Sequence, residues 1–397
     1  MHFAERPTPA RIKYKRTPYL IVSREASMRK DVYGSIDDHV VRQAQLLRGE
    51  SASETVIIAM HPIGSPAYLP LFSELARIGL HVIGCSSRYL LGDAALQMEN
   101  VLLDIGACVR DAKERLGYKK VILAGWSGGG SPMMTYQAEA EKRTITATAA
   151  GEASLLAQTS LDRANGILFL AAPRSRHRLL TDFLDASVRN ELEPDRDRDR
   201  EYDLYDPANP NRAPYSSEYV ASYRSRQRER NERITEFALG KLEDLRRAGR
   251  AHEEYAFVVH GTMADPRWLD STLEPNERRP GWSYLGDPAI ANTSPGALMR
   301  FTTTRSWLSQ WSMRTAQVDA ADAAPRVSVP VFVLVNGADD AVPVSHPQAV
   351  FDAISHDDKE FVRLPGANHY FSGADQKSYL SDAADIVYNW MERHGFV

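Results

Sequence analysis

The residues best suited to chemistry stand in one glycine-rich run, Gly125-Trp126-Ser127-Gly128-Gly129. An apolar stretch, VILAG, leads directly into it, and residues rich in alanine, methionine and glutamine follow it. This context predicts a serine on a sharp turn between a strand and a helix, where small residues are needed two positions before and after it. Gly125 and Gly129 meet that need. The helix would also point its free N–H groups toward Ser127, where negative charge develops in acyl transfer, so Ser127 is a candidate nucleophile.

The elements that position this serine alternate between strand and helix, which is typical of a parallel sheet with helices on both faces. Runs rich in β-branched residues predict strands at residues 55–60, 81–85, 121–125, 166–172, 330–336 and 360–364. Apolar residues at helical spacing predict helices at residues 68–78, 100–116, 346–354 and 378–393. The alternation stops after the fourth of these strands and returns at the fifth, so one α/β domain is interrupted and resumed.

The interrupting stretch, residues 174–326, is rich in arginine, aspartate, proline and tryptophan. Within it, apolar side chains recur every three or four positions over residues 217–247, which predicts one long amphipathic helix. Residues 255–260 form its one strand-like run. We therefore predict a core built from residues 1–173 and 327–397, with a cap or lid inserted at 174–326.

The serine turn and its setting resemble the α/β-hydrolase fold superfamily, in particular its serine esterase-like branch with a long cap insertion. A second similar feature is His61-Pro62-Ile63-Gly64, which matches the superfamily's His-Gly loop except that Pro62 replaces a glycine. The resemblance implies a mostly parallel sheet with helices on both faces and a largely helical cap inserted after the sixth strand. It also implies an oxyanion hole. Because proline has no N–H, its donors would be Gly128 and Ile63.

The superfamily orders its triad along the chain as serine, acid and histidine. The predicted strand at residues 330–336 ends in GADDAVP, which is similar to the acid-bearing loop of the superfamily. The spacing before Val-Pro favours Asp339, whereas counting from Gly337 favours Asp340. Asp182 and Asp185, after an earlier strand, are further alternatives.

The candidate base is His369, which ends the sequence PGANH after the last predicted strand. It follows the serine and the candidate acids along the chain, as the superfamily order requires, and it matches the histidine loop of the superfamily. His346 begins a predicted helix and His394 lies in the C-terminal tail, so they fit the base less well. His61 fits the bracing of its own loop better than a direct role.

Aromatic residues supply the candidates for a substrate pocket. Trp126 lies inside the serine turn, where it could line the pocket or pack beneath it. Trp307 and Trp311 are four residues apart in a predicted helix, with Phe301 nearby. This apolar stripe suits either core packing or a pocket wall under a cap. Together these residues predict a large, apolar pocket and a small-molecule carbonyl substrate.

The composition excludes several classes of protein. The chain of 397 residues has 43% hydrophobic and 25% charged residues and a net charge of -4, which gives no global bias toward nucleic acid or anionic membranes. Its two cysteines, Cys85 and Cys108, cannot build a disulfide framework or a multi-cysteine metal site. No run approaches the ~20 apolar residues of a membrane span, and the N-terminus lacks an apolar signal segment. We expect a cytoplasmic protein without metal or organic cofactor.

Arg267 and Arg305 could bind a substrate carboxylate, although surface positions suit so arginine-rich a chain better.

The predicted activity is hydrolysis of a carboxylic ester or lactone through an acyl-enzyme on Ser127. His369 would accept the serine proton and Asp339 would orient the imidazole. Hydrolysis of a carbon–carbon bond in a diketo or ring-fission product is the alternative, although such members of the superfamily often carry tryptophan where Tyr370 stands. Amidase, peptidase or thioesterase activity and a non-catalytic ligand-binding role stay open. Haloalkane dehalogenase and epoxide hydrolase chemistry are disfavoured because they use aspartate at the position of Ser127.

Overall fold

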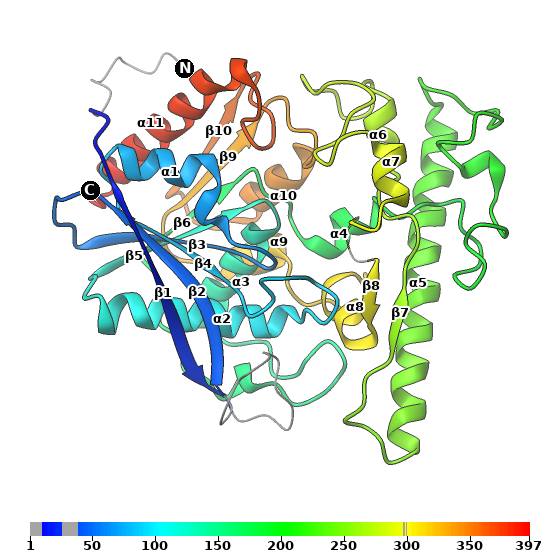
Figure 1. The fold of residues 1–397 in the computed structure, drawn as a ribbon, viewed down its shortest axis with the longest axis horizontal. Coiled ribbons are helices and arrows are strands. Elements are labelled where there is room, and N and C mark those ends of the chain that lie inside the picture. Colours follow the sequence, from blue (N-terminus) through cyan, green and yellow to red (C-terminus); the bar gives the residue numbers. More distant parts are fainter. Residues whose placement is uncertain (1–9, 26–38, 297, 299) are drawn as a thin grey trace.

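An eight-stranded sheet forms the centre of the structure, a computed structural model that describes residues 10–25, 39–296, 298 and 300–397 (Figure 1). The strands follow the order β1-β2-β4-β3-β5-β6-β9-β10. From β4 to β10 all neighbours are parallel, whereas β2 pairs antiparallel with β1 and with β4. The strands are β1 (Lys15–Arg24), β2 (His39–Arg48), β3 (Thr55–His61), β4 (Val82–Ser86), β5 (Lys120–Trp126), β6 (Gly166–Leu170), β9 (Val331–Asn336) and β10 (Lys359–Leu364).

Helices cover both faces of this sheet. In Figure 1, α1 and α11 lie on one side of the sheet and α2 and α3 on the other. The helices that pack on the sheet are α1 (Pro70–Arg77), α2 (Met98–Arg110), α3 (Gly130–Glu141), α9 (Ala320–Ala323), α10 (Ser345–Ala353) and α11 (Lys377–Arg393). The mostly parallel, doubly covered sheet that the sequence predicted is thus present.

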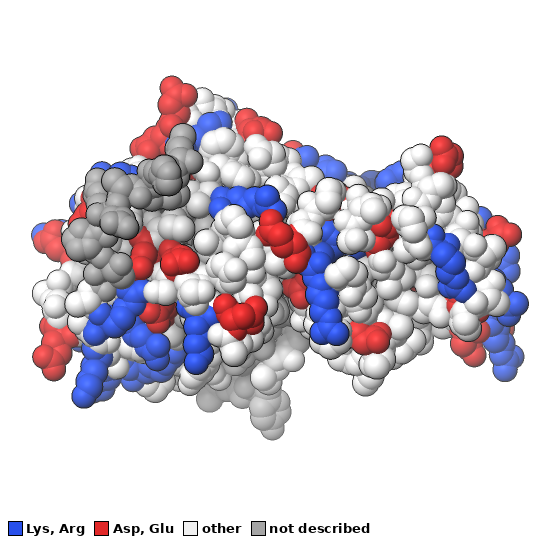
Figure 2. All heavy atoms as spheres, turned by 90° about the horizontal axis from the view of Figure 1, so that it is seen from above, with Lys and Arg blue, Asp and Glu red and all other residues white. Residues whose placement is uncertain are grey.

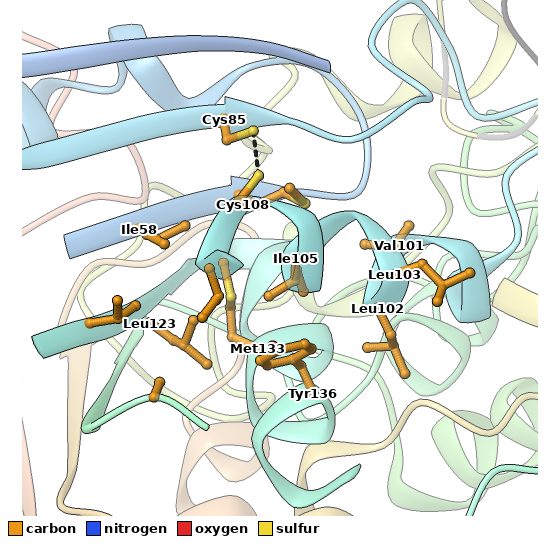
Figure 3. Packing of buried hydrophobic residues seen from close by; sticks show 14 of the residues in the cluster. Ile58, Cys85, Val101, Leu102, Leu103, Ile105, Cys108, Leu123, Met133 and Tyr136 are labelled. Carbon is orange, nitrogen blue, oxygen red and sulfur yellow. Dashed lines mark hydrogen bonds between the residues drawn. The ribbon is translucent and has the colours of Figure 1, made fainter. Parts of the chain in front are cut away.

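The central strands are apolar throughout because each of their faces meets a helix layer. On β3, Val56 and Ile58 pack in the cluster of α2 and α3, whereas Ile57 and Ala59 pack in the cluster of α1 and α11. Figure 3 shows the first of these clusters, where strand residues meet the buried faces of both helices.

The two cysteines lie in this same cluster. Cys85 belongs to β4 and Cys108 to α2, and both are buried. Their Sγ atoms are 2.7 Å apart, and Figure 3 shows the two side chains pointing toward each other.

All six predicted strands are present, with their ends shifted by two residues at most. β6 ends at Leu170 rather than at residue 172, because Ala171 has a positive φ of 43° that breaks the extended backbone. β1 and β2 were not predicted from the sequence. On β2, the buried face includes Arg42, which is fully buried and forms an ion pair of 2.6 Å with Asp104. A buried arginine hides the apolar alternation that would have marked this strand.

The chain between β6 and β9, residues 171–330, is here called the β6–β9 segment, and it holds most of the helices outside the sheet layers. It contains α4 (Arg176–Thr181), α5 (Ser217–Arg247), α6 (Pro266–Leu269), α7 (Pro288–Thr293), α8 (Thr304–Gln310) and α9, with the short strands β7 (Ala256–Val258) and β8 (Phe301–Thr303). The predicted helix at residues 217–247 coincides with α5, which stands apart from the sheet in Figure 1. A segment with several helices therefore follows β6, while its role as a cap and its boundaries at residues 174 and 326 stay predictions.

Buried polar contacts hold the β6–β9 segment on the core. The Glu99 carboxylate of α2 accepts hydrogen bonds from Ser309 Oγ at 2.6 Å and from Gln317 Nε2 at 3.1 Å. Arg305, 3% exposed, donates to both oxygens of Glu152, which lies outside the segment. These contacts fix α8 against the core.

The surface agrees with the near-neutral composition. Figure 2 shows basic and acidic side chains interspersed on the larger lobe and on the smaller one, and the outline dips between the two lobes. No helix in the described ranges is both long enough and apolar enough to cross a membrane.

Candidate active site

Ser127 lies on a strained turn at the end of β5. A short 3-10 turn over Ser127–Gly129 leads from β5 into α3, and Ser127 has a φ of 50°, which is uncommon for a residue other than glycine. A Cβ atom at Gly125 would come within 2.5 Å of the Gly129 carbonyl oxygen, and one at Gly129 would collide with the carbonyl oxygen of Met60. Only glycine fits at these two positions, as the sequence analysis expected.

Ser127 opens onto a cavity of about 420 Å³. Its wall is largely apolar and includes Ile63, Leu69 and Leu90, with the ring of Trp126 beside the serine. Leu91, whose side chain is almost fully exposed, also lines it. The cavity therefore offers an apolar surface next to the candidate nucleophile.

Three of the four predicted pocket residues lie elsewhere. Trp307 and Trp311 are fully buried and stack on each other with ring centroids 5.4 Å apart, in the hydrophobic cluster that also holds Ile234 of α5. Phe301 lies on β8 and is 59% exposed. The tryptophans thus pack in a core, which was the other interpretation of this stripe, and Trp126 alone of the four lines the cavity.

His369 and Asp339 form a buried pair. The Nδ1 atom of His369 lies 2.9 Å from Oδ2 and 3.0 Å from Oδ1 of Asp339. The backbone N–H groups of Ala341 and Val342 donate to Oδ1 at 2.8 and 2.7 Å, so the loop after β9 holds the carboxylate in place. This arrangement orients the imidazole with Nε2 facing away from the carboxylate.

The geometry distinguishes Asp339 from the other candidate acids. Asp340 is partly exposed, and burial, together with the Asp339 charge, raises its pKa to about 6. Asp185 is held by Arg198 at 2.8 Å inside the β6–β9 segment, where Asp182 also lies. Asp340 interacts with the His369 backbone, whereas Asp339 is the carboxylate that pairs with the His369 ring.

His369 has the protonation chemistry of a general base. Burial disfavours its charged form, but the charge and hydrogen bond of Asp339, with a smaller contribution from Asp340, raise its pKa above the ordinary value. Its Nε2 atom is buried and has no hydrogen-bond partner among the described residues. The Trp126 ring, next to Ser127 in the chain, lies 5.9 Å from the imidazole, so His369 lies close to the serine turn.

His61, the last residue of β3, lies beside Gly128 and contacts Ile63 of the following loop. His61 Nδ1 lies 2.6 Å from the Ile63 carbonyl oxygen, and burial, with the nearby Arg176 charge, lowers the pKa of His61 to about 4. A neutral His61 therefore braces its own loop. The Ile63 N–H points at the same ring nitrogen at 3.3 Å, so it would have to turn from the ring to serve as an oxyanion donor.

Gly128 is packed under two side chains. A Cβ atom at this position would lie 2.8 Å from Nε2 of His61 and 3.0 Å from Nη1 of Arg176. The guanidinium of Arg176 thus lies next to the backbone whose N–H is the first expected oxyanion donor.

Sequence reasoning missed Arg176 and Tyr284 as neighbours of this site. Arg176 follows β6 closely, and the carboxyl ends of parallel strands are where ligands bind in open α/β sheets, so its position was the signal that could have found it. The Tyr284 ring lies 6.0 Å from that of His369. Tyr284 comes from an irregular part of the β6–β9 segment and carried no comparable signal.

Comparison with known proteins supports the fold. No family model and no curated protein matches the sequence. Among solved structures, the alpha/beta hydrolase GrgF from Penicillium sp. sh18 is similar with a TM-score of 0.50 and 12% identity, over 96% of this chain and 99% of that one. The siderophore hydrolase EstB from Aspergillus fumigatus has a TM-score of 0.48 and 13% identity, over 89% and 94% of the two chains. Est1E from Butyrivibrio proteoclasticus has a TM-score of 0.45 and 12% identity, over 89% of this chain and 96% of that one. The strand order, the serine turn after β5 and the likeness to GrgF show that this chain has the α/β-hydrolase fold.

Proposed function

We propose that the protein is a serine hydrolase that cleaves a carboxylic ester or lactone. The observation that supports the proposal is a strained Ser127 at an apolar cavity, with a buried His369–Asp339 pair whose imidazole lies 5.9 Å from the ring of Trp126, the residue before Ser127. This combination is what nucleophilic attack on a carbonyl carbon requires.

Each group has a defined part in the proposed reaction. Ser127 Oγ attacks the carbonyl carbon while His369 Nε2 takes its proton, and the imidazolium then protonates the leaving alcohol. Asp339 keeps the remaining proton on Nδ1 and stabilises the imidazolium. Gly128 N–H, at the start of the helical turn, donates to the developing oxyanion. Water then attacks the acyl-enzyme with His369 as the base.

The residues of the cavity wall indicate the chemical character of the substrate. Ile63, Leu69 and Leu90 present apolar surface beside Ser127, so we expect one side of the scissile bond to be apolar. A small-molecule carbonyl compound fits these walls. A cytoplasmic location stays a prediction from the sequence.

The test is covalent labelling together with ester turnover. Wild type should gain one fluorophosphonate adduct by intact mass and should hydrolyse p-nitrophenyl butyrate, and Ser127→Ala should lose both. Ser131→Ala is a matched control, because Ser131 is a buried serine on α3, the helix that follows the Ser127 turn, and is not part of the cavity wall. Retention of labelling in Ser127→Ala would contradict the assignment of the nucleophile.

Carbon–carbon hydrolysis uses the same groups and stays the alternative. An adduct on Ser127 without turnover of acetyl, butyryl or octanoyl esters would move the proposal to a diketone substrate. Absence of both adduct and turnover would leave a ligand-binding role.

A further inference from the structure

Arg176 is a buried cation at the proposed site. It is 6% exposed, and its Nη1 atom lies 3.0 Å from the position that a Cβ of Gly128 would take. The Nε2 atom of His61, a residue of the cavity wall, lies 2.8 Å from the same position, so the guanidinium is adjacent to that wall residue. Nothing in the proposed ester hydrolysis uses this charge.

Arg176 is held in a fixed direction by the β6–β9 segment. Its Nε and Nη2 atoms both donate to Oε1 of Gln310, at 3.1 and 2.8 Å. The amide is neutral, so it orients the guanidinium without compensating its charge. Nη1 has no hydrogen-bond acceptor among the described residues and remains open for another group.

Other buried arginines of the described chain have close carboxylate partners or several backbone carbonyl partners. Five of them have a carboxylate oxygen at 2.8 Å or less, and a sixth, Arg278, donates to a set of backbone carbonyls. The five with a close carboxylate are Arg42, Arg88, Arg230, Arg267 and Arg305. Arg176 has its nearest carboxylate, that of Asp93, at 3.6 Å from Nη2.

This partial pairing leaves a cation that attracts an anion. Burial lowers the pKa of Arg176, and the Asp93 charge does not restore it to the ordinary value. A buried charge without full pairing is costly, and an anionic ligand that pairs with it removes that cost. With one open nitrogen, the site suits a carboxylate, whereas a phosphate group would need several donors.

We propose that Arg176 binds a carboxylate of the substrate, so that the enzyme acts on half-esters of short dicarboxylic acids. The inference rests on the proposed function, because it names the substrate class of the same site. Nη1 lies beside Gly128, whose N–H would hold the reacting carbonyl oxygen. The second carboxylate must therefore be close to the scissile carbonyl, as in a succinate half-ester. The alcohol side would occupy the apolar wall formed by Leu69 and Leu90.

The first experiment compares two substrates of nearly equal shape. Monoethyl succinate carries the carboxylate, and ethyl 4-oxopentanoate carries a neutral acetyl group in its place. We expect wild type to prefer monoethyl succinate in kcat/KM, and we expect Arg176→Gln to lower this preference on the order of 30-fold, the usual scale for removing one partner of a buried charged pair. Arg176→Lys should keep part of it, because the charge remains while the planar fork is lost.

The matched control is Arg178→Gln. Arg178 lies on the same helix, but its side chain is 38% exposed and pairs with Asp319 at 2.8 Å. This variant should keep the wild-type preference. If wild type does not prefer the half-ester, or if Arg176→Gln lowers kcat/KM equally for both substrates, the carboxylate assignment is overturned. An equal loss would instead indicate that Arg176 donates to the oxyanion or supports the fold.

A binding measurement separates this inference from the proposed function. Calorimetry on Ser127→Ala should detect monoethyl succinate but not ethyl 4-oxopentanoate, and Ser127→Ala combined with Arg176→Gln should lose that binding. If no ester is turned over and no adduct forms while this pattern of binding holds, the proposed function fails and the carboxylate site stands. If monoethyl succinate does not bind, the carboxylate site fails whatever the fate of the ester chemistry.

Discussion

Replacing Asp339 by asparagine changes one atom and reverses the direction of one hydrogen bond. The Oδ1 atom of Asp339 accepts from the N–H groups of Ala341 and Val342, so the carbonyl oxygen of an asparagine would stay at this position. The amide nitrogen would then take the place of Oδ2, which lies 2.9 Å from Nδ1 of His369. An amide nitrogen only donates, so Nδ1 must accept and the imidazole proton moves to Nε2. His369 then has no lone pair directed toward Ser127.

The size of the effect follows from the loss of the base. A histidine held in the wrong tautomer cannot take the serine proton, and such a change costs roughly 10⁴ in kcat, or about 5 kcal/mol in the barrier. The side-chain volume is unchanged and both backbone hydrogen bonds to Oδ1 remain. We therefore expect the folded structure to persist while the chemistry fails.

The assay is kcat for p-nitrophenyl butyrate, supported by the rate of fluorophosphonate labelling and by the thermal midpoint. Asp340→Asn is the control, because the neighbouring carboxylate makes no hydrogen bond to the His369 ring among those of the described residues. It should lose less than tenfold. A loss in Asp340→Asn larger than in Asp339→Asn, or an Asp339→Asn variant within tenfold of wild type, would refute the assignment of the acid.

Three further predictions use other parts of the structure. Gly128→Ala should lower kcat/KM at least tenfold, while circular dichroism should show an intact fold. The reason is that the new methyl group would lie 2.8 Å from the end of the His61 side chain and 3.0 Å from that of Arg176. Unchanged activity would show that both side chains move freely. Because the pKa of His369 is raised, kcat/KM should increase with pH through a midpoint above 6.5, and Asp340→Asn should move that midpoint down. The same raised pKa stabilises the fold below the unfolded pKa, and this contribution is lost as pH rises through the folded value. Arg305→Gln should lower the free energy of unfolding by about 2 kcal/mol in urea titrations, since the partly exposed Glu152 carboxylate loses its partner at 2.6 Å and keeps the more distant Arg246, at 3.7 Å.

The features that the sequence predicted well are those with local signals. The serine turn is marked by Gly125 and Gly129 within a few residues of Ser127, and α5 by the period of its apolar face. The acid loop was found by its spacing, but the choice between Asp339 and Asp340 depends on which side chain turns toward His369. That is a property of the folded loop, and the backbone hydrogen bonds to Oδ1 decide it.

The features that it missed depend on contacts between distant segments. β2 was not predicted because Arg42 occupies its buried face, and the ion pairs that make this burial acceptable come from Asp104 on α2 and from Glu25. The place of Arg176 soon after β6 was a signal for a site residue, but its orientation depends on Gln310, which lies far away in the chain. The tryptophan stripe had two possible uses, and the packing of α5 against α8 decides for the core.

The glycines around Ser127 differ in how they constrain the evolution of the site. At Gly125 and Gly129, any side chain would strike backbone atoms, which no substitution elsewhere can move away. At Gly128, it would strike the ends of the side chains of His61 and Arg176, which a second substitution can shorten. Combinatorial libraries should therefore leave the first two positions fixed and vary the third together with these two neighbours. Among natural homologues, residue 128 should covary with them, and a larger residue there should accompany a different substrate preference.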